Sequence, residues 1–159
     1  MNDACGSPLP LPDIEACRAL RGGAALTSPW MQIDQAMVDR FADATLDHQW
    51  IHVDAQRAAS ESPYGCTIAH GFLSLSLLSH LVGQVFSYPG RKTSVNYGFD
   101  RVRFTAAVPV GARLRASVKL AELTDIAPQE ARITWDVALE IAGSMRPALV
   151  ARWLVQMRY

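Results

Sequence analysis

The chain has 159 residues, half of them hydrophobic, and its 15 basic and 15 acidic side chains give a formal net charge of zero. This length suits one domain with a sizeable core, and the lack of a basic block argues against nucleic acid as a partner. Three cysteines without a CxxC spacing favour a reducing compartment. The N-terminus has no signal-peptide pattern, and the apolar run 72–86 is too short and polar to span a membrane. We therefore expect a soluble, cytoplasmic protein.

The first 25 residues have the composition of an extension, and residues 26–159 read as one domain without repeats or linkers. Three prolines in the run Ser-Pro-Leu-Pro-Leu-Pro predict an extended tail, residues 1–12, that lies outside the core. Asp13 is a good N-cap for a short helix over residues 14–21, which the following Gly-Gly pair is expected to end.

The domain begins with short elements of mixed type. Residues 26–33 indicate a first strand, and apolar side chains at helical spacing predict a helix over residues 34–45. Residues 46–52 follow neither period and are expected to form a polar loop. Asp54 should then cap a short helix that runs through Ser60.

A long apolar segment follows, from His70 to Phe86. Its apolar side chains cover nearly all sides of a helix, which indicates a buried helix wrapped by a sheet. Alternating apolar and polar residues in the rest of the chain predict several strands, with turns at Pro128 and at residues 143–147. This order argues for an α+β fold in which an antiparallel sheet curls round the helix.

An acid, two imidazoles and an amide gather just ahead of that helix, in residues 47–52. Asp47 and His52 could converge on one water molecule, and an acid and an imidazole can exchange protons near neutral pH. The alternative is an aspartate that caps the turn and a histidine that hydrogen-bonds to it. His48 and His52 have the spacing of a metal pair on a helix, but no third ligand stands out, so we expect no metal.

These residues resemble the signature of the MaoC-like dehydratases, the (R)-specific enoyl-CoA hydratases, and most of all their NodN-like branch. That signature has an Asp, four residues, a His and a later Ala-His-Gly, which match Asp47, His52 and residues 69–71. A further match runs from Asn96 to Phe104 and continues into Val-Pro-Val-Gly. The resemblance covers the chain from Trp30 to its C-terminus.

The resemblance implies a hot-dog fold, in which the sheet surrounds the central helix, and a homodimer with sites near the subunit interface. It implies a hydro-lyase of fatty acid metabolism that converts trans-2-enoyl-CoA to (R)-3-hydroxyacyl-CoA, or the reverse. Asp47 and His52 would activate the water. The acyl-CoA thioester is then the substrate, and we expect no cofactor beyond its CoA.

Further site residues follow from the resemblance. The Gly71 N–H, in the first turn of the central helix, could donate to the thioester carbonyl as an oxyanion hole; the alternative is a glycine needed for packing. His70 is expected to line the pocket or cap the helix, and Gln49 and Asn96 to contact the substrate. Leu46 stands where the family usually has Gly, so the loop is either ordinary in conformation or strained.

Two other functions stay open. A hot-dog thioesterase would cleave the thioester, but such families often place their carboxylate on the central helix, and residues 72–86 contain no Asp or Glu. A dehydratase-like subunit that binds acyl-CoA without activity is kept open by Leu46. Arg101 and Arg103 could meet the phosphates of CoA or be ordinary charges on a strand face.

Overall fold

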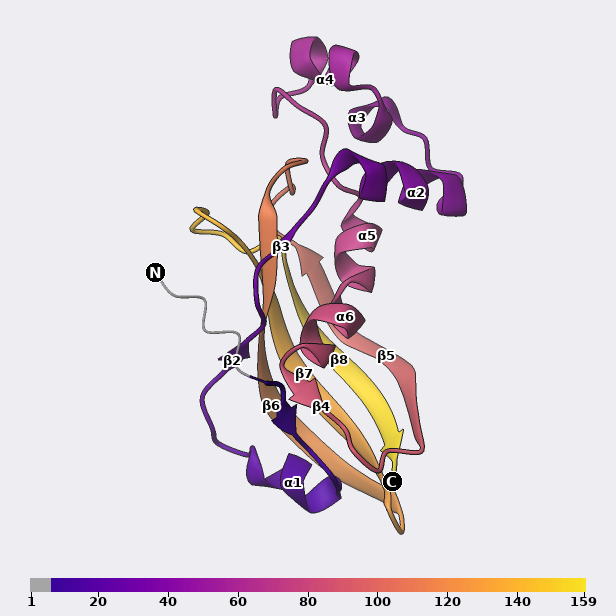
Figure 1. Ribbon diagram of the computed structural model, residues 1–159, viewed down its shortest axis with the longest axis vertical. Coiled ribbons are helices and arrows are strands. Elements are labelled where there is room, and N and C mark those ends of the chain that lie inside the picture. The colour runs from indigo at the N-terminus through magenta and orange to yellow at the C-terminus, as the bar shows by residue number, and fades with distance from the viewer. Residues whose placement is uncertain (1–6) are drawn as a thin grey trace.

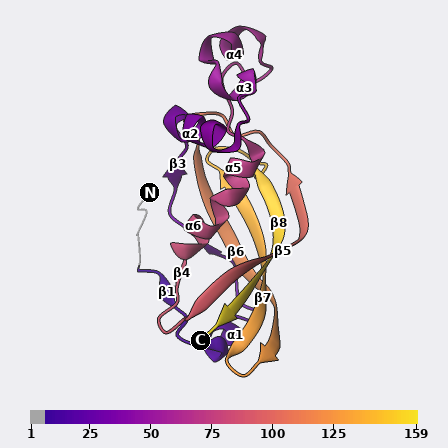
Figure 2. The same cartoon turned by 90° about the vertical axis from the view of Figure 1, so that its right-hand side faces the viewer.

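A computed structural model describes residues 7–159 as a curved antiparallel sheet with helices along one face and at both ends (Figures 1 and 2). The strands run in the order β2-β6-β7-β8-β5, and β3 also pairs with β6. This arrangement confirms the predicted α+β fold. The long strands are β5 (Thr93–Phe104), β6 (Arg113–Ala127), β7 (Glu130–Ile141) and β8 (Leu149–Arg158).

The single strand predicted over residues 26–33 is wrong. Two short strands, β2 (Leu26–Thr27) and β3 (Met31–Gln32), take its place, and each pairs with β6. Pro29 lies between them, and a proline has no N–H to donate to a ladder of hydrogen bonds. The Ser28 N–H still donates to the Ala116 carbonyl, so the chain leaves β6 after Ser28 and pairs with it again at Met31.

The central helix is shorter and less regular than the predicted span 70–86. It consists of α5 (Gly71–Ser76) and α6 (Leu78–Gly83), joined at Leu77, whose N–H contacts two preceding carbonyl oxygens. The chain leaves the helix at Gly83, and β4 (Phe86–Ser87) follows. Glycine is a poor helix former, which accounts for the early end.

The prediction that this helix is buried on all sides is also wrong. One side packs on the inner face of the sheet through Leu73, Leu78, Leu81 and Val82. The other side is open, and the Phe72 side chain is 69% exposed. A single sheet covers only one side of a helix, so all-round apolarity in the sequence overstated the burial within one chain.

Part of the N-terminal tail belongs to the core, against the prediction, although residues 1–6 lie outside the described residues. β1 (Leu9–Pro10) pairs in parallel with β4, and Leu11 is only 2% exposed. The N–H groups of Leu9 and Leu11 donate to the carbonyls of Val85 and Ser87, both at 2.8 Å. The alternating prolines keep the backbone extended, while the leucines between them supply the donors.

The helix after the tail, α1 (Ile14–Ala19), lies at the end of the sheet where the C-terminus also lies (Figure 1). The predicted cap is confirmed, because Asp13 accepts a hydrogen bond from the Ala16 N–H at 2.8 Å. Cys17 is fully buried, and its Sγ lies 3.4 Å from the Tyr159 hydroxyl. Burial raises the pKa of the Cys17 thiol.

Three helices extend beyond the opposite end of the sheet (Figure 1): α2 (Gln35–Thr45), α3 (Trp50–Val53) and α4 (Ala55–Glu61). Asp34 and Asp54 cap α2 and α4 as predicted. The segment 46–52, predicted as a loop, enters the helical turn α3 at Trp50. None of the helices in residues 7–159 is long and apolar enough to cross a membrane.

Candidate active site

Asp47, His52 and His70 come together where α3 meets the start of α5. Each offers one side-chain atom, and these three atoms lie within 4.8 Å of one another. The two imidazole rings are stacked, with centroids 3.7 Å apart and planes 26° apart. Both histidines are buried, whereas the Asp47 side chain is about half exposed. The chain therefore brings a solvated carboxylate to the edge of a buried imidazole pair.

Hydrogen bonding determines which nitrogen of His52 carries the hydrogen. Its Nδ1 lies 2.7 Å from the carbonyl oxygen of Ile68. A carbonyl oxygen can only accept, so Nδ1 holds the hydrogen and Nε2 presents a lone pair. Burial lowers the pKa of His52, and its hydrogen bond to Ile68 works against that shift. His52 is therefore suited to act as a neutral base.

His70 lies behind His52. Its Nε2 lies 2.9 Å from the main-chain oxygen of Asp47 and 4.0 Å from one carboxylate oxygen of the same residue. Of the two roles considered for His70, capping holds only for its position: it is the N-cap residue of α5, but its side chain makes no capping hydrogen bond. Among the described residues, it is His52 and not His70 that borders the adjoining cavity.

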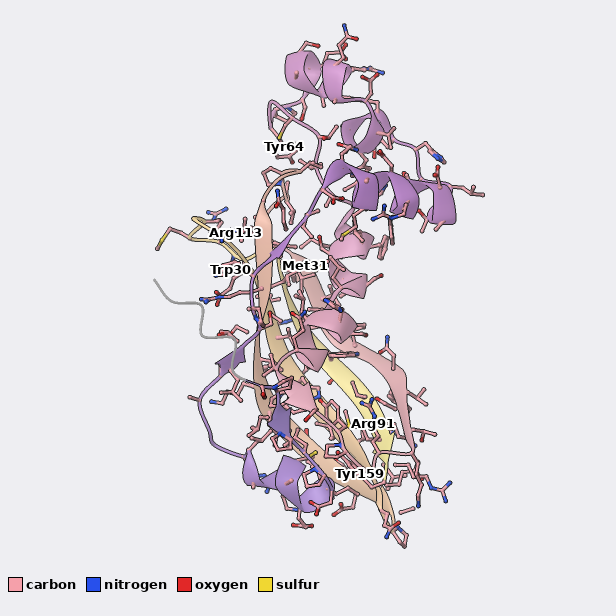
Figure 3. The ribbon with its side chains drawn as sticks, viewed as in Figure 1. Trp30, Met31, Tyr64, Arg91, Arg113 and Tyr159 are labelled. Carbon is pink, nitrogen blue, oxygen red and sulfur yellow. The ribbon has the colours of Figure 1, made fainter. Side chains whose placement is uncertain are left out.

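That cavity has a volume of about 340 Å³ and lies between the start of α5 and the end of β5. Its lining includes His52, Tyr64, Gly71 and Phe104, together with the alanine-rich segment 105–108. Figure 3 places Tyr64 at the end of the molecule that carries α2 to α4. One imidazole and the first residue of α5 thus line a mostly apolar cavity, and such a cavity suits an uncharged acyl group.

Gly71 fits both of the roles considered for it. No described residue accepts a hydrogen bond from its N–H, which faces no preceding helical turn. A Cβ atom at this position would lie 3.2 Å from the ring of Phe104, closer than side chains normally approach. The packing role is thus supported by a contact, and the oxyanion role stays a prediction.

The backbone at Leu46 is strained, which is the second of the two conformations considered for this loop. Its φ of 61° and ψ of 22° are left-handed, a conformation that favours glycine, and the side chain is 82% exposed. The left-handed turn ends α2 and leads directly into Asp47. The strain is therefore located one residue before the predicted catalytic carboxylate.

Replacing Leu46 with glycine should raise the free energy of unfolding by about 0.5–1 kcal/mol, because the left-handed strain is relieved and little packing is lost. Leu46→Ala is the matched control, since it removes the same exposed side chain and keeps the strain. Urea denaturation of both variants measures the difference. A Leu46→Gly variant that unfolds at less urea than Leu46→Ala would contradict the expectation.

The other predicted contact residues do not join this cluster. Gln49 is exposed at the start of α3 and makes no capping hydrogen bond. Asn96 on β5 accepts a hydrogen bond from Trp153 Nε1 at 2.8 Å and lines a separate cavity of about 500 Å³ beside α6. Arg101 and Arg103 are exposed on β5. Substrate contact by Gln49 and Asn96 therefore stays a prediction.

Two aromatic residues of the cavity were missed in the sequence. Phe104 is the last residue of the stretch 96–104 that resembles the family, but nothing in the sequence indicated that its side chain would lie against Gly71. Tyr64 belongs to a Pro-Tyr-Gly turn, where an aromatic residue carries no specific meaning. Only the folding of distant segments onto the start of α5 identifies both as neighbours of His52.

Two histidines and a carboxylate are a chemically reasonable set for a metal ion. Imidazole lone pairs lie in the ring planes, and the planes of His52 and His70 are 26° apart at a centroid distance of 3.7 Å. Such lone pairs run side by side and do not meet at one ion about 2.0–2.1 Å from each nitrogen. The ring geometry supports the prediction that the site uses no metal.

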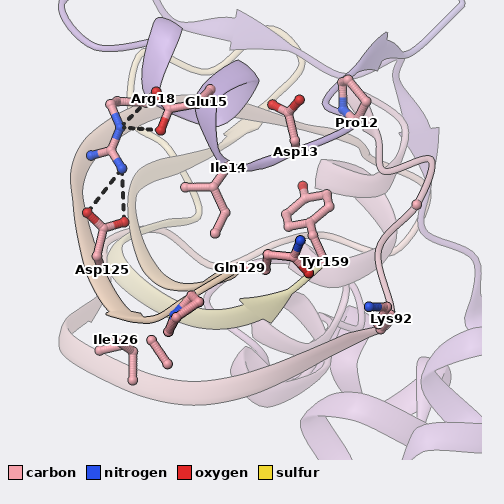
Figure 4. A pocket seen from close by; sticks show the side chains of 13 residues that line it. Pro12, Asp13, Ile14, Glu15, Arg18, Lys92, Asp125, Ile126, Gln129 and Tyr159 are labelled. Atoms are coloured by element: carbon pink, nitrogen blue, oxygen red, sulfur yellow. Dashed lines mark hydrogen bonds and ion pairs between the residues drawn. The ribbon is translucent and has the colours of Figure 1, made fainter.

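A larger cavity, of about 870 Å³, opens at the opposite end of the molecule, beside α1 (Figure 4). Three of its charged side chains pair with one another, since Arg18 donates to both Glu15 and Asp125. Tyr159 also lines it, and its hydroxyl donates to the Leu11 carbonyl. The smaller cavity is the better candidate for chemistry, because it holds an imidazole with a free lone pair.

Residues 19–140 match the MaoC like domain, which covers most of the chain. The chain belongs to the MaoC-like dehydratase family. The predicted NodN-like resemblance is confirmed by nodulation protein N of Rhizobium meliloti, 45% identical over 134 residues that cover 80% of each protein. The 3-hydroxyacyl-thioester dehydratase Z of Mycobacterium tuberculosis is 47% identical over 129 residues, covering 81% of this chain and 85% of that protein.

The hot-dog fold predicted for this MaoC-like dehydratase is confirmed by solved structures. The structure of the (R)-hydratase from A. caviae involved in PHA biosynthesis matches with a TM-score of 0.65 and 26% identity, covering 85% of this chain and 96% of that one. The family and these relatives confirm the predicted class of enzyme, a hydratase or dehydratase.

Proposed function

We propose that this MaoC-like dehydratase hydrates trans-2-enoyl-CoA to (R)-3-hydroxyacyl-CoA, or catalyses the reverse dehydration. The observation that carries the proposal is His52, whose Nδ1–H is held by Ile68 and whose Nε2 is left free beside Asp47, on the wall of a mostly apolar cavity. Relatives named as a 3-hydroxyacyl-thioester dehydratase and an (R)-hydratase support the reaction class. The reaction needs no cofactor beyond the CoA of the substrate.

In the proposed reaction, one water molecule donates hydrogen bonds to the Asp47 carboxylate and to His52 Nε2. As the water oxygen bonds to C3 of the enoyl group, His52 takes the proton and the C2–C3 electron pair moves toward the thioester carbonyl. The Gly71 N–H donates to the carbonyl oxygen while negative charge develops there. The His52 imidazolium then delivers its proton to C2, so the sum is the addition of one water.

We propose a second copy of this chain as the protein partner. β5 is the last strand of the sheet and pairs only with β8 in the described chain, so its other edge is free to form hydrogen bonds. Val95, Tyr97 and Phe104 on this strand are 49–59% exposed, although all three are apolar or aromatic. A homodimer would cover this edge, and sedimentation analysis should then give twice the mass of one chain.

The test of the function follows the loss of enoyl absorbance when purified protein meets crotonyl-CoA, with free thiol measured in the same sample. Fast loss without thiol release is the expected result. Thiol release would favour a thioesterase. No reaction with crotonyl-CoA or a longer enoyl-CoA would contradict the proposal and favour an inactive acyl-CoA-binding subunit. A cytoplasmic location stays a prediction.

The pH profile should reflect the environment of His52. Burial and the adjacent His70 ring lower the pKa of His52, while the Ile68 hydrogen bond and the Asp47 charge oppose this. A base must be unprotonated, so kcat/KM should fall on the acid side with a midpoint below about 6.5, the ordinary value for histidine. Rates of crotonyl-CoA hydration from pH 5 to 8 measure it. A midpoint above that value would contradict the neutral-base assignment.

A further inference from the structure

His70 is a buried imidazole that the proposed reaction leaves unused. It is 2% exposed and packs against the rings of His52 and Phe41, with centroid distances of 3.7 Å and 5.0 Å. It lies at the start of α5 without capping it. A buried polar ring is normally satisfied by hydrogen bonds, and this one makes a single hydrogen bond to a described residue.

That one bond reaches across 23 positions of the chain to the main-chain oxygen of Asp47. The oxygen can only accept, so the hydrogen of His70 is on Nε2. Its Nδ1 is buried without a partner among the described residues, and a hydrogen there would be a buried donor without an acceptor. The ring is thus committed to one tautomer and one orientation.

The partner of this bond lies in the short segment 46–49, which joins α2 to α3. Leu46 is left-handed and exposed, and among the described residues the His48 side chain bonds only to the exposed Asp43, so few side chains hold this segment in place. The bond from His70 therefore ties the Asp47 main chain to the start of α5. The same ring lies flat against His52, so one side chain fixes both members of the proposed catalytic pair.

We propose that His70 is a positioning residue for hydration: it holds the Asp47 main chain through Nε2–H and orients the His52 ring by stacking. This inference rests on the proposed function. Because His70 does not border the described cavity, its loss displaces the groups that hold the water and leaves thioester binding in place. The effect should appear in kcat and not in KM.

Two substitutions separate the hydrogen bond from the packing. Glutamine places an amide N–H close to the position of Nε2, whereas leucine fills a similar volume without a donor. His70→Leu should lower kcat for crotonyl-CoA by about 10- to 100-fold with KM changed less than about threefold, because small displacements of reacting groups have effects of this size. His70→Gln should retain kcat within about threefold of the parent, on the same grounds.

His80→Leu is the matched control, because His80 is exposed on α6 and, among residues 7–159, its side chain bonds only to Gln84. It should leave both constants unchanged. An equal loss of kcat in His70→Leu and His70→Gln would overturn the role of the hydrogen bond. A rise in KM at constant kcat in His70→Leu would instead assign His70 to substrate binding and overturn the proposal.

A second measurement does not depend on activity. Nitrogen NMR of labelled histidine should find the hydrogen of His70 on Nε2 in the parent. Amide hydrogen exchange of residues 46–48 should become faster in His70→Leu and stay near the parent rate in His70→Gln. Unchanged exchange in His70→Leu overturns the positioning role even if hydration is found. Failure of the parent to hydrate any enoyl-CoA overturns the proposed function itself.

Discussion

Replacing His52 with asparagine is expected to lower kcat for enoyl-CoA hydration by about 10²- to 10⁴-fold, the usual contribution of a general base. Asparagine carries an N–H near the position of Nδ1, so it can still donate to the Ile68 carbonyl, which lies 2.7 Å from that nitrogen. It has no group at the position of Nε2, and the water therefore loses its proton acceptor.

The control for this loss is His48→Asn. His48 belongs to the same short stretch, but its side chain is half exposed and contacts Asp43 at 2.9 Å. Although His48 follows Asp47 in the chain, its side chain bonds to Asp43 and does not line the cavity, so its replacement should leave kcat within about twofold. Circular dichroism should show that both variants fold.

Asp47→Asn separates the two candidate acceptors. If His52→Asn keeps most of the activity while Asp47→Asn loses it, the carboxylate takes the proton and the assignment of His52 is wrong. Loss in both variants supports a water held between the two groups, in which either deletion removes one of its hydrogen bonds.

Replacing Trp135 with alanine is expected to lower the free energy of unfolding by about 3–5 kcal/mol. Trp135 is fully buried on β7 and stacks on Phe86, with ring centroids 5.0 Å apart and planes at 22°. It therefore joins the sheet to β4, the strand that follows the central helix. Alanine would leave a cavity in that contact, and urea denaturation measures the loss.

Two further variants make this prediction specific. Trp135→Phe keeps an aromatic face against Phe86 and removes the indole N–H, which has no partner among the described residues, so it should lose less than half as much stability. Trp30→Ala removes a partly exposed ring that contacts Arg113 and Arg115, and should lose about 0.5–1 kcal/mol. A larger loss for Trp30→Ala than for Trp135→Ala would contradict the ranking.

Local signals in the sequence predicted the helix starts correctly. Asp13, Asp34 and Asp54 each accept a hydrogen bond from the N–H three residues later, so the information lies within one helical turn. The four long strands could also be predicted, because the alternation of apolar and polar side chains is visible in neighbouring residues. Leu46 is an intermediate case. The family resemblance showed that the loop is either ordinary or strained at this position, and only the backbone angles of the structure show that it is strained.

Features that depend on distant segments could not be predicted. The Leu9–Pro10 strand pairs with residues 86–87, far along the chain. Because this partner could not be identified from the sequence, the proline-rich segment was predicted to be a tail outside the core. The open side of the central helix depends on what covers it and not on its own composition. In the site, residues 47–52 and 69–71 drew attention by their chemistry, but the bond from His70 to the Asp47 main chain has no sequence signal.

The alanine-rich wall of the cavity has a consequence for how the enzyme can evolve. Ala106, Ala107 and Ala148 line the cavity with small side chains that leave room in it, and none of them belongs to the Asp47 and His52 pair. An alanine codon becomes a valine codon by one nucleotide change. Under the proposed function, such a change would narrow the space for the acyl group and leave Asp47 and His52 as they are, so substrate size and catalysis would depend on separate residues.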